Sequence, residues 1–444
     1  MAGLFLWRRS VVQKSSLALF SPDELQGDST SFASFLNRAR SEREQSRDVP
    51  ARIALGAYLT ARLVGRCLGL TDSPDEQEGF RWQLDSTRKF LEDLPAAEPE
   101  ISHLLGIAES VTSSPAHRDA VLRMALIAYA YYLEHEARLE EALEVLGLSA
   151  RTYRTEIPPV DAATLALFVA RLNRLLARWD RANQAYELAE SAGISVRDAS
   201  TTLLARIGLA NVNRGQGNLP AARRALEQVV TDSNAPELAD VRGRALSDLS
   251  VVLERQGQLL EAITVRYQAL LCLKDEVQRT RVLGDLGIAL RSLGAYAAAR
   301  QSFDMVLSAE TGFLLRVNAC LELMELESAV GNRIAFERYR QEARTYQDRM
   351  PPSMAIDYRF KVGVSFARFG KEAKARATLR EALGLAEAHQ LNEWYFRVDR
   401  VLRGLQLCQD QQDFKIPTAE STDMAPAIAQ VSAGLLQMAG TVAG

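Results

Sequence analysis

A small residue followed by a turn residue recurs along the chain at a nearly constant distance, and this periodicity restricts the fold more than any other feature. The clearest copy is the stretch LGDLGIALRSLGAYAAARQSFDMVL, in which Gly287 precedes Gly294 by seven residues and Ala299 follows it. Apolar residues on both sides of Gly294 keep the spacing of one helical face. The stretch therefore predicts two helices that approach closely at the small residues and are joined by a sharp turn at Gly294.

Six further copies of this pattern occur. The turn residues, five glycines and two alanines, are Ala137, Ala177, Gly217, Gly257, Gly294, Gly331 and Gly370. Successive turn residues are separated by 40, 40, 40, 37, 37 and 39 residues. One helical hairpin repeated at this period predicts an all-α fold, an α-solenoid of stacked antiparallel helix pairs in which each pair covers the apolar face of the next. The alternative is a nonrepetitive helical bundle.

The repeats resemble the tetratricopeptide repeat (TPR) family, in a long-period variant of 37–40 residues. The period exceeds the roughly 34 residues of that family, and the family's tryptophan and proline are absent from most copies. The resemblance implies a TPR-like superhelix of about seven repeats over residues 114–390. It also implies that the first helix of each repeat lines a concave groove.

The chain before the repeats has a different character. Residues 1–113 predict an N-terminal helical bundle or cap, with helices over 51–70, 74–94 and 98–111 and a polar stretch before them. The sequence Ser-Pro-Asp-Glu at 73–76 is a typical helix start. Basic residues interrupt the apolar segment 1–20, which predicts either a first helix or frayed end, or an amphipathic anchor or targeting segment.

The chain after the repeats predicts two segments. Residues 391–411 predict a C-terminal capping helix, which would cover the last apolar face of the stack. Residues 412–444 predict a flexible tail that carries no charge beyond position 424. The alternative for this tail is a helix docked on a partner or on the chain itself. The residues that could line one face of that helix are Ile428, Val431, Leu435, Leu436, Met438 and Val442.

Composition excludes several classes of function. Of the 444 residues 47% are hydrophobic and 25% are charged, which is typical of an ordered soluble protein. A net charge of −3 argues against general nucleic-acid binding, and no apolar run is long enough to predict a clear membrane span. Four scattered cysteines without a CxxC pair predict reduced thiols and a cytoplasmic protein.

No motif for catalysis or for metal binding occurs. The four histidines are isolated, and the sequence contains no HExxH, no P-loop and no GxSxG. Gly215 and Gly217 look like part of a phosphate loop, but they fall on a predicted helix–helix turn. We therefore expect a protein that is not an enzyme and that needs no cofactor and no metal.

The resemblance to the TPR family implies which side chains face the groove. These candidate partner-binding residues are Arg171, Arg174, Asn211, Arg214, Arg244, Arg281 and Arg291. Asparagine can pair with the backbone of an extended peptide, and arginine can form a forked contact with carboxylates. The alternative is that the arginines form ion pairs within the array.

These residues predict a scaffold or adaptor that binds a peptide or protein segment, of acidic character, in the groove. A helical bundle followed by about seven repeats also resembles, in layout, bacterial peptide-sensing regulators of the Rap type. That resemblance implies an alternative function, in which occupancy of the groove repositions the N-terminal bundle.

Overall fold

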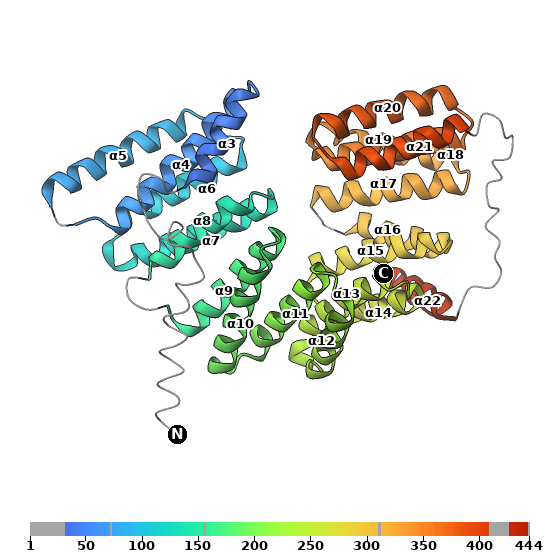
Figure 1. The fold of residues 1–444 in the computed structure, drawn as a ribbon, viewed down its shortest axis with the longest axis horizontal. Coiled ribbons are helices and arrows are strands. Elements are labelled where there is room, and N and C mark those ends of the chain that lie inside the picture. The colour runs from blue at the N-terminus through green and yellow to red at the C-terminus, as the bar shows by residue number, and fades with distance from the viewer. Residues whose placement is uncertain (1–31, 72, 154–156, 310–311, 408–425, 443–444) are drawn as a thin grey trace. The chain divides into compact units, whose positions relative to one another are not determined.

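The computed structural model describes residues 32–71, 73–153, 157–309, 312–407 and 426–442 (Figure 1). These residues form helices and no strand, which confirms the predicted all-α class. The α-helices are α3 (Ala33–Glu44), α4 (Asp48–Leu68), α5 (Pro74–Glu92), α6 (Pro99–Ser110), α7 (Pro115–His135), α8 (Leu139–Arg151), α9 (Pro159–Leu175), α10 (Trp179–Val196), α11 (Ala199–Gly215), α12 (Leu219–Asp232), α13 (Ala239–Arg255), α14 (Leu259–Cys272), α15 (Glu276–Ser292), α16 (Tyr296–Ser308), α17 (Phe313–Ala329), α18 (Arg333–Arg344), α19 (Pro352–Arg368), α20 (Glu372–Ala388), α21 (Asn392–Leu407) and α22 (Pro426–Val442).

Packing divides the chain into two compact units, residues 1–225 (unit 1) and 226–444 (unit 2). Consecutive helices pack as pairs, among them α7 with α8 and α9 with α10 in unit 1, and α13 with α14, α15 with α16, α17 with α18 and α19 with α20 in unit 2. We call the earlier member of each pair the first helix and the later member the second helix. Stacked helix pairs of one kind form a helical repeat, as the periodicity predicts.

All seven predicted turn residues adopt a left-handed backbone. The five glycines have φ between 69° and 83°, and Ala137 and Ala177 have φ of 58° and 55°. A left-handed residue at the end of a helix lets its own N–H group and the following N–H group donate to carbonyls of the last turn. Gly294 shows this geometry, since its N–H donates to Arg291 and the following N–H donates to Leu290. The predicted positions of the hairpin turns are therefore confirmed.

Small residues bring the two helices of a pair together. A Cβ atom placed on Gly287 of α15 would lie 2.6 Å from the ring of Phe303 on α16, closer than packed atoms approach. Gly363 of α19 meets Leu379 of α20 at the same distance. Ala299, on the facing side of α16, is completely buried. Close approach at these residues lets the surrounding large side chains interdigitate.

The N-terminal helices pack onto the first repeat pair. One cluster of buried apolar residues runs from Phe32 to Val212 and so crosses position 113. Packing does not divide the chain at the predicted boundary between residues 113 and 114. The separate role of residues 1–113 as a bundle or cap stays a prediction. Helix α3 occupies part of the polar stretch that precedes the expected helices, and its residue Phe35 is completely buried in the core.

The C-terminal end contains two further helices. Helix α21 packs on α20 and α19, in the position expected of a capping helix. Helix α22 differs from the flexible tail that we expected over 412–444, because it packs on α14 and α16 of unit 2. Its residues Ile428, Val431 and Leu435 are buried in the core of that unit. Burial of three apolar residues at helical spacing favours the docking of this helix on unit 2.

Candidate functional site

The seven predicted groove residues are divided between the two units, so each group has its own surroundings. Unit 1 contains Arg171, Arg174, Asn211 and Arg214, on the first helices α9 and α11. Unit 2 contains Arg244, Arg281 and Arg291, on the first helices α13 and α15.

Arg171 is held by an ion pair and by aromatic rings. Its Nη2 donates to Glu134 Oε2 of α7 at 2.7 Å. Its guanidinium lies over the rings of Phe168 and Tyr131, at 4.7 and 5.7 Å from their centroids. These two rings stack on each other with centroids 4.4 Å apart. Arg171 therefore already has a carboxylate and two π-faces as partners.

The other three candidates in unit 1 also contact the protein. Arg174 is half-buried, and its Nε lies 3.4 Å from the hydroxyl of Tyr186, to which it donates. Asn211 is buried and Arg214 is half-buried, and both interact with other residues. The Arg174–Tyr186 contact joins α9 to α10.

An apolar strip on α7 is open to solvent. Val121, Met124, Ala128 and Tyr131 follow one another at helical spacing, and we call these four residues the α7 strip. The exposed fractions of Val121, Met124 and Tyr131 are 42%, 73% and 48%. Val160 of α9 is also exposed. None of these four residues is among the seven candidates from the sequence. The signal that could have found them is that apolar residues are distributed around α7, whereas a helix in the middle of a stack needs them only on its packed faces.

A buried ion network fastens the N-terminal helices to the first repeat pair. Glu100 of α6 accepts from Arg38 of α3 at 2.9 Å, from Arg138 beside α8 at 2.8 Å and from the Tyr129 hydroxyl of α7 at 2.7 Å. Burial alone would raise the pKa of Glu100, but Arg138 and Arg38 hold it below its usual value. Because every oxygen of this carboxylate is engaged, the network joins α3, α6 and α7 without an open position for a ligand.

A second ion network joins three first helices of unit 2. Arg291 of α15 lies 3.2 Å from both Glu322 and Glu325 of α17. Lys361 of α19 lies 2.5 Å from Glu322 and 2.9 Å from Asp357. Burial would lower the pKa of Lys361, but Glu322 and Asp357 raise it above its usual value. The predicted groove residue Arg291 is thus engaged by carboxylates of the next repeat.

In three ion pairs the partners are separated by about one repeat. Arg171 and Glu134 are 37 residues apart, Arg178 and Glu140 are 38 apart, and Lys361 and Glu322 are 39 apart. Equivalent positions of stacked repeats lie next to each other, so opposite charges one period apart meet. Arg291 departs from this spacing, because its partners Glu322 and Glu325 follow it by 31 and 34 residues. The repeat spacing therefore signals some of the ion pairs within the array but not that of Arg291.

Two of the predicted arginines in unit 2 are exposed. Arg244 and Arg281 form no ion pair with any residue that the structure describes. Beside them, Arg266 of α14 is buried and binds both carboxylate oxygens of Glu254, at 2.8 and 2.9 Å. It also donates to the backbone oxygen of Asp285.

A hollow of about 210 Å³ lies between α15 and α17, with α16 behind it. We call it the α15–α17 hollow. Its lining is Thr280, Arg281, Gly284 and Asp285 from α15, Phe303 and Val306 from α16, and Leu315, Asn318 and Ala319 from α17. Burial by the surrounding protein raises the pKa of the Asp285 carboxyl, against the opposing effects of Arg266 and Arg281.

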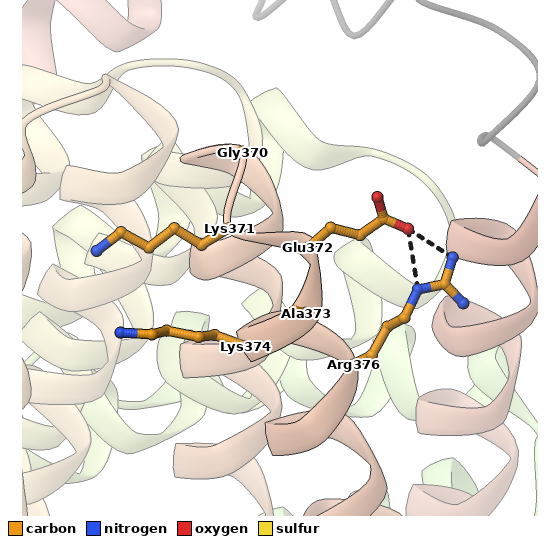
Figure 2. Close-up of a pocket in the computed structure, with 6 residues that line it drawn as sticks. All are labelled: Gly370, Lys371, Glu372, Ala373, Lys374 and Arg376. Atoms are coloured by element: carbon orange, nitrogen blue, oxygen red, sulfur yellow. Dashed lines mark hydrogen bonds and ion pairs between the residues drawn. The ribbon is translucent and has the colours of Figure 1, made fainter.

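A second hollow lies at the start of α20 (Figure 2). Lys371 and Lys374 point to the same side, and Arg376 bends toward Glu372. The Nε and Nη2 of Arg376 donate to one oxygen of Glu372 at 2.9 and 2.6 Å. The hollow is an open surface at a helix end, and its two lysines are the only charges that point outward together.

The part of the chain that the structure describes offers no group of three or more His, Cys, Asp or Glu placed to hold a metal ion. Within the same residues, no helix combines the length and the apolarity needed to cross a membrane.

Comparison with known proteins gives only remote likenesses. No family model and no curated protein matches the sequence. Among solved structures, a Rap protein complexed with competence and sporulation factor has a TM-score of 0.44 at 10% identity, over 81% of this chain and 99% of that chain. The apo form of RapI has a TM-score of 0.42 at 10% identity, over 81% and 100%. The apo form of the quorum sensor NprR from B. thuringiensis has a TM-score of 0.40 at 13% identity, over 84% and 97%. At these identities and TM-scores the likeness assigns neither a ligand nor an activity to this chain.

Proposed function

We propose that this chain is a non-catalytic protein of the tetratricopeptide type, a scaffold or adaptor that binds a peptide or an extended protein segment on the first helices of its repeats. In this proposal residues 114–390 form the binding array and residues 1–113 form the N-terminal bundle. Cys67 and Cys320 are buried free thiols, which suits a reducing compartment such as the cytoplasm.

The α7 strip carries this proposal. Large apolar side chains on a monomer's surface are usually scattered, and several on one helix face mark an interaction site. Tyr131 gives the strip a rigid aromatic side chain of the kind that anchors protein interfaces. The Arg171–Glu134 ion pair beside it supplies a polar edge. This combination favours a partner that presents apolar side chains.

A peptide selection tests the proposal directly. Random peptides displayed on phage would be selected on the immobilised full chain, and the enriched sequences would be tested on Met124→Glu and Ile334→Glu. Both residues are exposed, at 73% and 86%, so neither substitution should disturb the fold. Enriched peptides should bind Met124→Glu at least about tenfold more weakly, because a carboxylate would have to be desolvated against their apolar side chains. They should bind Ile334→Glu as they bind the unsubstituted chain.

Enrichment that is equally strong on Met124→Glu would contradict the α7 strip as the binding surface. A selection that enriches no peptide would contradict the proposed function itself.

A second candidate function is a peptide-sensing regulator, and the ion network around Glu100 favours it. Because Glu100 links α3, α6 and α7, a shift of the first repeat pair would be transmitted to the N-terminal helices. In this case a selected peptide should change the radius of gyration measured by X-ray scattering. An unchanged radius at saturating peptide would leave the scaffold as the function.

A further inference from the structure

The α15–α17 hollow contains a glycine that packing does not require. In Gly287, Gly363 and Gly243, an added Cβ would meet a neighbouring side chain at 2.6 Å, so helix packing explains these glycines. A Cβ on Gly284 would meet no atom within 4 Å. Glycine inside a helix costs stability relative to alanine. The effect of Gly284 is that the space between α15 and α17 stays open.

The polar groups at the edge of this hollow are unengaged, in contrast to those further along the same two helices. Arg281, Asp285 and Asn318 make no side-chain hydrogen bond or ion pair with any described residue. On the same two helices, Arg291 and Glu322 take part in the second ion network. The hollow therefore presents a guanidinium, a carboxylate and an amide that form no hydrogen bond or ion pair with the side chains that the structure describes.

The size of the hollow limits its occupant. A volume of about 210 Å³ is smaller than the roughly 300–1,000 Å³ of a pocket for a drug-sized ligand. Phe303 and Val306 form an apolar floor, which favours a branched or aromatic side chain. At the edge, Asn318 can pair with a peptide backbone through both its donor and its acceptor, and Arg281 can form a forked contact with a carboxylate.

We propose that the α15–α17 hollow is a subsite for one apolar side chain of a bound peptide, next to a carboxylate that Arg281 binds and a backbone amide that Asn318 binds. The subsite rests on the proposed function in that its ligand is a peptide, but it belongs to unit 2, whereas the α7 strip belongs to unit 1. The carboxylate belongs either to the peptide's C-terminus or to an acidic side chain beside the apolar residue.

N-acetyl-leucine is a small probe that contains an apolar side chain, a carboxylate and a backbone amide. Its binding to the full chain can be measured by ligand-observed NMR, with N-acetyl-leucine amide and N-acetylglycine as partners that lack the carboxylate and the apolar side chain. We expect saturable binding of N-acetyl-leucine in the millimolar range, as befits so small a ligand. The amide should bind several-fold more weakly, and N-acetylglycine should not saturate. Equal and unsaturable signals from all three compounds would overturn the proposal.

Filling the hollow tests its location. Gly284→Leu places a side chain in the open space, and binding of N-acetyl-leucine should fall at least about tenfold. Gly384→Leu on α20 is the matched control, because a Cβ there also meets no atom within 4 Å and the residue lies outside the hollow. Binding that survives in Gly284→Leu, with the helical circular dichroism unchanged, would place the probe elsewhere and refute the subsite.

Changing the charges tests how the carboxylate is recognised. Arg281→Met keeps the length of the side chain, and it should make N-acetyl-leucine and its amide bind equally. Asp285→Asn removes a like charge, and it should tighten N-acetyl-leucine about threefold while leaving the amide unchanged. An unaltered preference for the carboxylate in Arg281→Met would exclude Arg281 as its partner.

Two short peptides separate the sources of the carboxylate. Acetyl-Gly-Gly-Leu with a free C-terminus should bind best if the subsite takes a chain end, and acetyl-Gly-Leu-Asp-Gly amide should bind best if it takes an acidic side chain. The two proposals can fail separately. If selected peptides bind through the α7 strip but Gly284→Leu binds all of these probes normally, the proposed function stands and the subsite is refuted.

Discussion

At the scale of single residues, the charged groups of the first helices have two different roles. Arg171 and Arg291 are neutralised by Glu134 and by the Glu322–Glu325 pair, so they hold neighbouring repeats together. Arg281 is exposed and has no such partner in the described residues. Removing one member of a buried pair leaves an uncompensated charge, whereas removing an exposed arginine costs little stability. Only an arginine of the second kind is available to a ligand.

Glu144 of α8 is a buried carboxyl whose ionisation opposes folding. It accepts from the backbone N–H and the hydroxyl of Ser34 on α3, at 3.3 and 3.0 Å. Burial raises the pKa of Glu144 from 4.5 to about 7, and nearby Glu141 adds to this rise against the two bonds from Ser34. The folded chain therefore binds a proton that the unfolded chain lacks between these two pH values. The stability of unit 1 should fall as pH rises from about 4.5 to 7.

Glu144→Gln should remove this loss. We expect the free energy of unfolding above pH 7 to rise by roughly 1–2 kcal/mol, and the difference between pH 5.5 and pH 8 to shrink, as measured by urea unfolding. Glu136→Gln, at an exposed position after α7, is the control and should follow the unsubstituted chain. A parallel pH profile in Glu144→Gln would show that another group causes the dependence.

At the scale of elements, α15 contains two glycines with opposite effects on stability. Gly287 lies against the ring of Phe303, whereas Gly284 borders the α15–α17 hollow. A single turn of α15 thus includes a position at which any side chain overpacks the helix pair and a position at which a side chain has room.

Gly287→Ala and Gly284→Ala should therefore differ in sign. A methyl group at 287 would push α15 and α16 apart and destabilise the chain by about 1–3 kcal/mol. A methyl group at 284 would meet no atom and should stabilise it by about 0.5–1 kcal/mol, since alanine loses less conformational entropy in a helix. Chemical denaturation of both variants checks this pair. A loss of stability in Gly284→Ala would mean that the hollow closes in solution.

The uncharged helix α22 packs on unit 2 through a glycine and one apolar face. Gly434 lies so close to Tyr267 of α14 that a Cβ atom would be 1.9 Å from the hydroxyl. The exposed side of the helix still includes Leu436. A glycine at the contact and apolar residues on one face fit α22 to the second helices α14 and α16.

At the scale of the whole molecule, the chain has separate apolar cores. The main cluster of unit 1 and the main cluster of unit 2 share no residue. In repeat proteins each pair contacts mainly its neighbours, so stability is distributed along the chain. Opening of one unit therefore need not be accompanied by opening of the other.

Core truncations in the two units should act locally. Leu104→Ala in unit 1 and Leu286→Ala in unit 2 each remove a completely buried side chain and should cost about 2–5 kcal/mol. Hydrogen exchange followed by mass spectrometry should show faster exchange in residues 32–225 for the first variant and in residues 226–442 for the second. Faster exchange in both units with either variant would show that they unfold as one cooperative unit.

The amino-acid sequence by itself determined where each hairpin turns and where its helices approach. Gly294 takes a left-handed φ because glycine lacks a Cβ atom, and Gly287 permits a close contact for the same reason. Ala137 takes a left-handed φ against the steric preference of alanine, so its place in the repeat spacing, not its residue type, marks the turn. Only the tertiary structure decided which groove residues are open. Arg291 is paired and Arg281 is not, because their surroundings come from helices a repeat away. The same holds for α22 and for the α15–α17 hollow, since docking and empty space depend on surfaces that exist only once the repeats have stacked.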